Sequence, residues 1–100
     1  MTTKAEQVHK DAVAALGCLI CYLESGILGT PANLHHTKTG MGAGQRNDDW
    51  HVLPLCPRHH QTGGWGVAYH AGPREWQRRY GTETQLLETV NVLLERENIA

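Results

Sequence analysis

Residues 50–60 read WHVLPLCPRHH, and this stretch combines an apolar run with closely spaced metal-binding residues. The run Trp50–Leu55 is short and apolar, which favours a β-strand with Pro54 near its end. Cys56 and His59 follow at a two-residue spacing, which lets both side chains of one turn converge on one tetrahedral ion. The stretch therefore predicts a strand that leads directly into a metal-binding knuckle.

A second knuckle of the same spacing, Cys18 and Cys21, lies far upstream. With Cys56 and His59 it makes a Cys₃His set, which is typical of a closed structural zinc site that ties two regions of a chain together. A chain of 100 residues without Phe has a small core, so zinc would add folding free energy that the core lacks. The odd number of cysteines argues against a closed set of disulfides. The alternative to zinc is buried free thiols, because Cys is among the most buried residue types.

Helices are predicted on both sides of this core. Thr3 with Glu6, and Thr82 with Gln85, have the spacing of capping boxes, and apolar residues recur at helical spacing after each. Gly17 is placed to end the first helix. We expect one domain over 1–100, made of a helix over 3–17, a metal-bearing core over 18–72 and C-terminal helices over 73–97.

Six of the seven histidines lie within residues 35–70. Any one of them could be an ordinary surface or core residue, but the group is larger than a core needs. A neutral imidazole is able to ligate a divalent ion or to accept a proton from water near neutral pH, and this chemistry suits metal-assisted hydrolysis. Of these six, the histidines without a place in the knuckles are His35, His36, His51, His60 and His70.

The formal net charge is −1, with nine Lys and Arg residues, so any contact with nucleic acid has to come from a local patch. Arg74 and Arg78 would share one face of a predicted helix, and other basic residues lie near the histidines in sequence. The alternative is an ordinary solvated surface. No signal peptide or long apolar run is visible, so we expect a soluble protein in a reducing compartment. The candidate phosphate contacts are Lys38, Arg46, Arg58, Arg74 and Arg78.

The pair His35–His36, the stretch at 50–60, the later His70 and the pair Tyr80–Gly81 together resemble the HNH, or ββα-metal, endonucleases. The arrangement is similar to the phage and prophage recombination-enhancement nucleases of the Ref type, over about residues 18–81. The resemblance implies an α+β fold with a small ββα-metal core, a structural zinc knuckle and flanking helices.

The resemblance also implies a role for each free histidine. His36 would be the general base that activates water. His35, His60 and His70 would hold a catalytic divalent metal, Mg²⁺, Mn²⁺ or Zn²⁺. His51 stands where the family often has the Asn that orients the base, and the glycine-rich segment 62–66 would interrupt the helix that usually carries both late ligands.

The function expected from this resemblance is metal-dependent hydrolysis of DNA phosphodiester bonds in phage or prophage recombination, in the cytoplasm of a bacterial host. DNA is the expected partner, with a recombinase filament as a candidate helper. One alternative is a non-catalytic zinc adaptor that binds nucleic acid or protein, and another is a regulatory or inactive relative. The free histidines favour the nuclease, because an adaptor needs only the four knuckle ligands.

Overall fold

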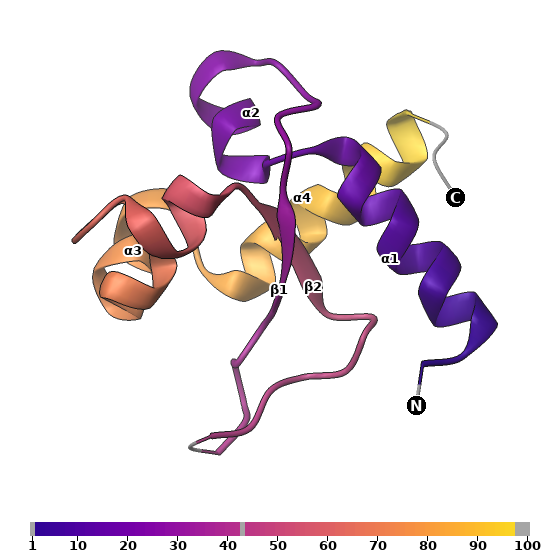
Figure 1. Ribbon diagram of the computed structural model, residues 1–100, viewed down its shortest axis with the longest axis horizontal. Helices are drawn as coiled ribbons and strands as arrows, with labels where there is room; N and C mark the ends of the chain where they lie inside the picture. Colours follow the sequence, from indigo (N-terminus) through magenta and orange to yellow (C-terminus); the bar gives the residue numbers. More distant parts are fainter. Residues whose placement is uncertain (1, 43, 98–100) are drawn as a thin grey trace.

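The computed structural model describes residues 2–42 and 44–97, and a two-stranded hairpin lies at its centre with helices around it (Figure 1). This arrangement confirms the expected α+β class. The elements in chain order are α1 (Lys4–Leu16), α2 (Leu19–Ser25), β1 (Asn33–His36), β2 (Val52–Leu55), the π-helical turn η1 (Arg58–Thr62), the 3₁₀ turn η2 (Tyr69–Ala71), α3 (Pro73–Tyr80) and α4 (Glu83–Arg96).

The hairpin is antiparallel, and its register pairs Asn33 with Leu55 and His36 with Val52. Strand β2 is buried along its whole length, because α1, α2 and α4 all contact it. The strand begins two residues later than the sequence predicts. The side chain of Asp48 accepts a hydrogen bond from the Trp50 backbone, which forms a local turn before the strand.

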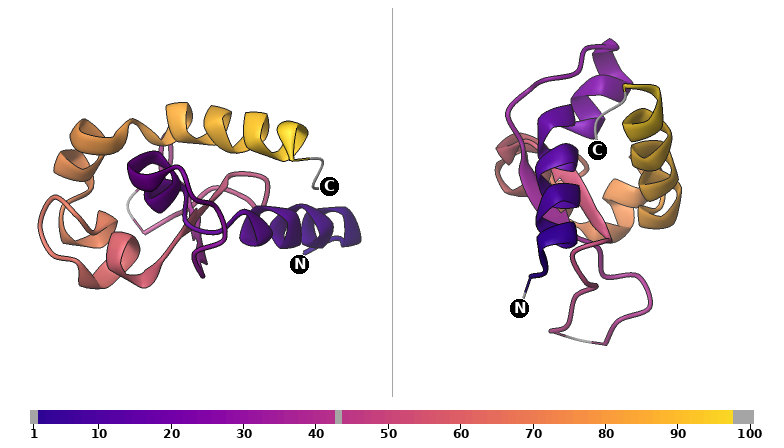
Figure 2. Two further views of the ribbon diagram at one scale, coloured as in Figure 1. Left: turned by 90° about the horizontal axis from the view of Figure 1, so that it is seen from above. Right: turned by 90° about the vertical axis from the view of Figure 1, so that its right-hand side faces the viewer.

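Both predicted capping boxes are present. Thr3 Oγ1 accepts from the Glu6 backbone at 3.1 Å, and Glu6 Oε1 accepts from the Thr3 backbone at 2.9 Å. The Thr82 box of α4 has the same two bonds. Helices α1 and α4 contact each other and lie side by side (Figure 2).

The sequence analysis did not indicate helix α2, because Cys18 and Cys21 were interpreted only as a metal-binding knuckle. The helix is only seven residues long, too short for a helical period to stand out. The sulfur of Cys18 serves as its N-cap, accepting from the Cys21 backbone at 3.5 Å. Gly17 before it has a φ of 79°, and a Cβ there would lie 2.5 Å from the Gly29 backbone nitrogen. Only glycine therefore permits this close approach.

The core is one cluster of apolar side chains that includes Leu16, Ile20, Leu55 and Trp76. Cys18 and Cys56 belong to the same cluster, so the cysteines are continuous with the core. Among the described residues, none of the helices combines the length and the apolar character needed to cross a bilayer.

Candidate metal centres and active site

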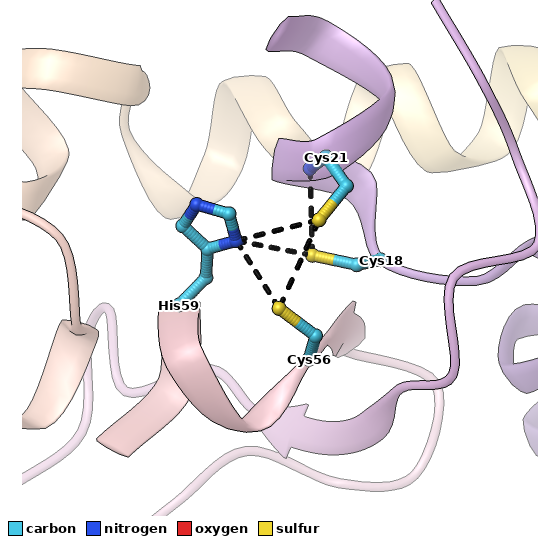
Figure 3. Close-up of side chains that lie close together, drawn as sticks. All are labelled: Cys18, Cys21, Cys56 and His59. Atoms are coloured by element: carbon cyan, nitrogen blue, oxygen red, sulfur yellow. Dashed lines mark hydrogen bonds between the residues drawn. The ribbon is translucent and has the colours of Figure 1, made fainter. Parts of the chain in front are cut away.

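Four side chains converge beside α2, and we call Cys18, Cys21, Cys56 and His59 the knuckle cluster (Figure 3). The sulfurs of Cys21 and Cys56 are 3.8 Å apart, and His59 Nδ1 lies 3.2–3.6 Å from the three sulfurs. Ligands about 2.3 Å (sulfur) and 2.0 Å (nitrogen) from a tetrahedral zinc would be separated by about 3.8 Å and about 3.5 Å. The cluster therefore has the dimensions of a zinc site and is too wide for a disulfide.

Without a cation, the surroundings of the knuckle cluster disfavour the thiolate forms of Cys18 and Cys21. Burial and the neighbouring sulfurs of Cys18 and Cys56 raise the pKa of Cys21 to about 12. Burial raises the pKa of Cys18 as well. A divalent cation offsets this repulsion because it stabilises the thiolates directly.

A second group, His35, His60 and His70, forms what we call the three-histidine cluster, with one ligand nitrogen from each ring within 4.8 Å of the others. His60 Nε2 and His70 Nε2 are 3.0 Å apart. Two nitrogens about 2.1 Å from one ion and at right angles would be about 3.0 Å apart. The donor set is thus able to hold a divalent cation, although η1 and η2 are separate turns rather than one continuous helix.

The electrostatics of the three-histidine cluster favour the neutral forms of His60 and His70. Burial, followed by the charges of His35 and His70, lowers the pKa of His60 to about 4. Burial, His35 and Lys38 lower the pKa of His70. A neutral imidazole has the lone pair that a metal ligand requires.

A buried carboxylate that the sequence analysis did not single out lies behind this cluster. Glu83 Oε2 is 2.9 Å from His35 Nε2, and the Glu83 side chain is 2% exposed. Burial by itself would raise the pKa of Glu83, but hydrogen bonds from His35, Thr39 and Lys38 lower it to about 2. An acidic residue is common in the first turn of a helix, so the position of Glu83 in the sequence does not indicate a contact with His35.

His36 ends β1 and makes different contacts from His35. Its Nε2 is 2.7 Å from Asp49 Oδ1, and its Nδ1 is 3.3 Å from an Arg46 guanidinium nitrogen. Hydrogen bonds from His36 and Thr2 lower the pKa of Asp49 to about 2. Asp49 accepts the Nε2 proton, so the lone pair of His36 is on Nδ1, where it accepts a hydrogen bond from Arg46 in this structure.

The geometry does not favour the role that the resemblance gives to His51. Its Nδ1 lies 2.7 Å from Asp48 Oδ1, and about half of its side chain is exposed. Within the described residues, no hydrogen bond connects His51 to His36. The side chain that contacts the expected base is Asp49, which the sequence analysis missed.

A cleft of about 210 Å³ brings the expected base, the three-histidine cluster and two of the expected phosphate contacts together. A larger cleft of about 740 Å³ shares His36 and Arg46 with it. Of the five predicted phosphate contacts, only Lys38 and Arg46 line the smaller cleft, while Arg78 lies 3.7 Å from Glu75. The smaller cleft is lined by Leu34, His35, His36, Lys38, Arg46, His60 and His70.

Comparison with protein families matched residues 2–95 to a family described as recombination enhancement, RecA-dependent nuclease. No curated protein matched the sequence. The family match spans almost the whole chain, and it agrees with the resemblance to recombination-enhancement nucleases in the sequence. The chain therefore belongs to the family of RecA-dependent nucleases of recombination enhancement.

Proposed function

We propose that this chain is a metal-dependent DNA endonuclease in which His36 is the general base and the three-histidine cluster holds the divalent cation. The observation that carries the proposal is the shared cleft, because His36 and all three candidate ligands line it together. A non-catalytic adaptor would need the knuckle cluster but not these four convergent imidazoles. Membership of a nuclease family supports the same conclusion.

The proposed base is prepared for proton transfer by its two neighbours. Asp49 holds the proton on Nε2 of His36, and this leaves Nδ1 to accept a proton from water. Arg46 donates to that same Nδ1 in the structure. A phosphate in the cleft would compete for the guanidinium, which binds phosphate strongly, and would free Nδ1 for water.

The cleft also supplies the positive charge that a phosphodiester requires. Lys38 and Arg46 lie beside the histidines and would hold phosphate oxygens without reading bases. A divalent cation in the three-histidine cluster would stabilise the charge that develops on the phosphoryl and leaving oxygens. The knuckle cluster, held by zinc, would fix η1 and with it the position of His60.

The direct test is a plasmid-nicking assay with purified protein, in the presence and absence of a RecA filament. We expect cleavage with Mg²⁺ or Mn²⁺ that stops when EDTA is added and that depends on the filament. Assays with the RecA filament are included because RecA dependence is part of the family description. DNA binding without cleavage under all of these conditions would favour the adaptor instead.

Asp49→Ala is expected to lower the cleavage rate at least about 10-fold, since losing the partner that orients a catalytic histidine costs up to roughly 10⁴-fold in other hydrolases. Asp48→Ala is the matched control, because Asp48 is the adjacent aspartate and contacts His51 instead. Single-turnover nicking rates at saturating DNA would compare them. Equal losses in the two variants would argue that Asp49 has no special role and would restore the case for His51.

Arg46→Ala is expected to weaken DNA binding at all sequences and to reduce the slope of log K against log salt by about 1, as the loss of one phosphate contact does. Arg78→Ala removes the same charge from a helix that does not line the cleft, and we expect the slope to stay unchanged. Fluorescence anisotropy over a salt series measures both. A reduced slope for Arg78→Ala and an unchanged slope for Arg46→Ala would place the DNA on the α3 side of the molecule.

A further inference from the structure

We infer that Glu83 is a positioning residue that fixes the tautomer of His35, keeping the ring proton on Nε2 and presenting the Nδ1 lone pair to the cation. The inference rests on the proposed three-histidine site. It adds Glu83, a residue of α4 that is not itself a proposed metal ligand. The observation behind it is a single buried carboxylate whose two oxygens have different sets of partners.

The oxygen Oε1 of Glu83 has three donors around it. The backbone nitrogens of Lys38 and Thr39 lie 2.9 Å away, and the Thr39 hydroxyl lies 2.7 Å away. Two of these three partners are backbone N–H groups, which can only donate. The position of Oε1 therefore has to be occupied by an acceptor.

The other oxygen, Oε2, faces His35 Nε2 at 2.9 Å. A carboxylate can only accept, so the hydrogen in this contact belongs to the histidine. Neutral imidazole carries one proton, and with that proton on Nε2 the lone pair is on Nδ1. This is the tautomer that a metal ligand at Nδ1 requires.

The surroundings hold both partners in place. The Tyr69 ring packs on His35 with the ring centres 4.2 Å apart, and the side chains of His35 and Glu83 are each 2% exposed. The backbone nitrogen of Glu83 donates to Gln77 Oε1 at 3.1 Å. Turning the His35 ring over would remove the imidazole donor from a buried carboxylate oxygen, so the packing and the hydrogen bond favour the same orientation.

The isosteric variant Glu83→Gln separates this role from a purely structural one. Its amide oxygen has to take the Oε1 position, because the three donors remain there. The amide NH₂ then faces His35 Nε2 and turns that nitrogen into an acceptor. The ring proton moves to Nδ1, and the nitrogen that should bind the cation loses its lone pair.

The experiment uses the full chain with zinc in the knuckle cluster and no ion in the three-histidine cluster. Nitrogen-15 NMR of the histidine rings, at a pH where they are neutral, distinguishes protonated nitrogens from those with a lone pair. A His35→Gln variant assigns the signals. Calorimetric titration with Mn²⁺ and with Zn²⁺ then measures binding to the second site in each protein.

We expect His35 to be protonated at Nε2 in the unmodified chain and at Nδ1 in Glu83→Gln, with affinity for the second ion lower by roughly 10–100-fold. The control Glu88→Gln removes the same charge from an exposed position of α4 and should match the unmodified chain. Zinc content and thermal melting show whether each variant is folded. The tautomer in the unmodified chain tests the inference even if Glu83→Gln does not fold.

Protonation of His35 at Nδ1 in the unmodified chain would overturn the inference. So would an unchanged affinity in a folded Glu83→Gln whose tautomer has switched, because the carboxylate would then be structural only. If the unmodified chain binds no second ion, the metal site of the proposed function fails and the positioning role fails with it. If the ion and the tautomer are as expected but DNA is not cut, only the proposed activity fails.

Discussion

Cys56→Ala is expected to yield an unfolded chain that holds no zinc. The loss of one buried heavy atom from a core costs about 1 kcal/mol, as for Ile→Val. Structural zinc contributes an apparent 10–16 kcal/mol, which is as large as the whole stability of a typical domain. The size of the effect therefore separates a zinc ligand from a buried thiol. Far-UV circular dichroism and metal analysis of the purified protein measure it.

The matched control for Cys56→Ala is Val13→Ala, which also shortens a fully buried side chain but touches no ligand. We expect that variant to melt at a lower temperature while it keeps its fold and one equivalent of zinc. A strong chelator should unfold the unmodified chain, and added zinc should refold it. A Cys56→Ala protein that is folded and metal-free would mean that the cysteines are buried thiols.

His36→Ala is expected to lower the DNA cleavage rate by roughly 10²–10⁴-fold, the usual contribution of a general base. The fold, the knuckle zinc and the second cation should all remain, because His36 belongs to neither cluster. Single-turnover nicking with saturating Mn²⁺, together with metal analysis, measures the two properties separately.

The control for His36→Ala is His9→Ala, which removes an imidazole from α1 that packs near Trp50 rather than in the cleft. We expect its cleavage rate to equal that of the unmodified chain. Near-normal cleavage by His36→Ala would remove the assignment of the base. A loss of the second cation in that variant would instead identify His36 as a ligand.

Local signals in the sequence predicted local structure well. Each capping box needs only a residue and its third neighbour, so Thr3 and Thr82 mark the helix starts in the sequence. Both knuckles show their ligands in the same local way through the two-residue spacing. Helix α2 gave no comparable signal, because it is short and its cap is a cysteine whose sulfur also faces the knuckle cluster.

The carboxylate partners of the histidines could not be predicted, because they are distant from the histidines in sequence. Glu83 meets His35 from 48 positions away, and Asp49 meets His36 from 13 positions away, so no periodicity relates them. Neighbouring aspartates also look alike in a sequence, although one contacts His36 and the other contacts His51. The fold alone decides which carboxylate each ring meets.

His59 and His60 are consecutive residues of η1, yet their rings enter different clusters. With the assignments proposed above, one short turn connects two ions, so filling either cluster stiffens the backbone that the other cluster uses. Binding at the two sites is then thermodynamically linked, and each ion raises the affinity of the chain for the other. A chain made under zinc starvation would be inert toward DNA however much magnesium or manganese the cell contained.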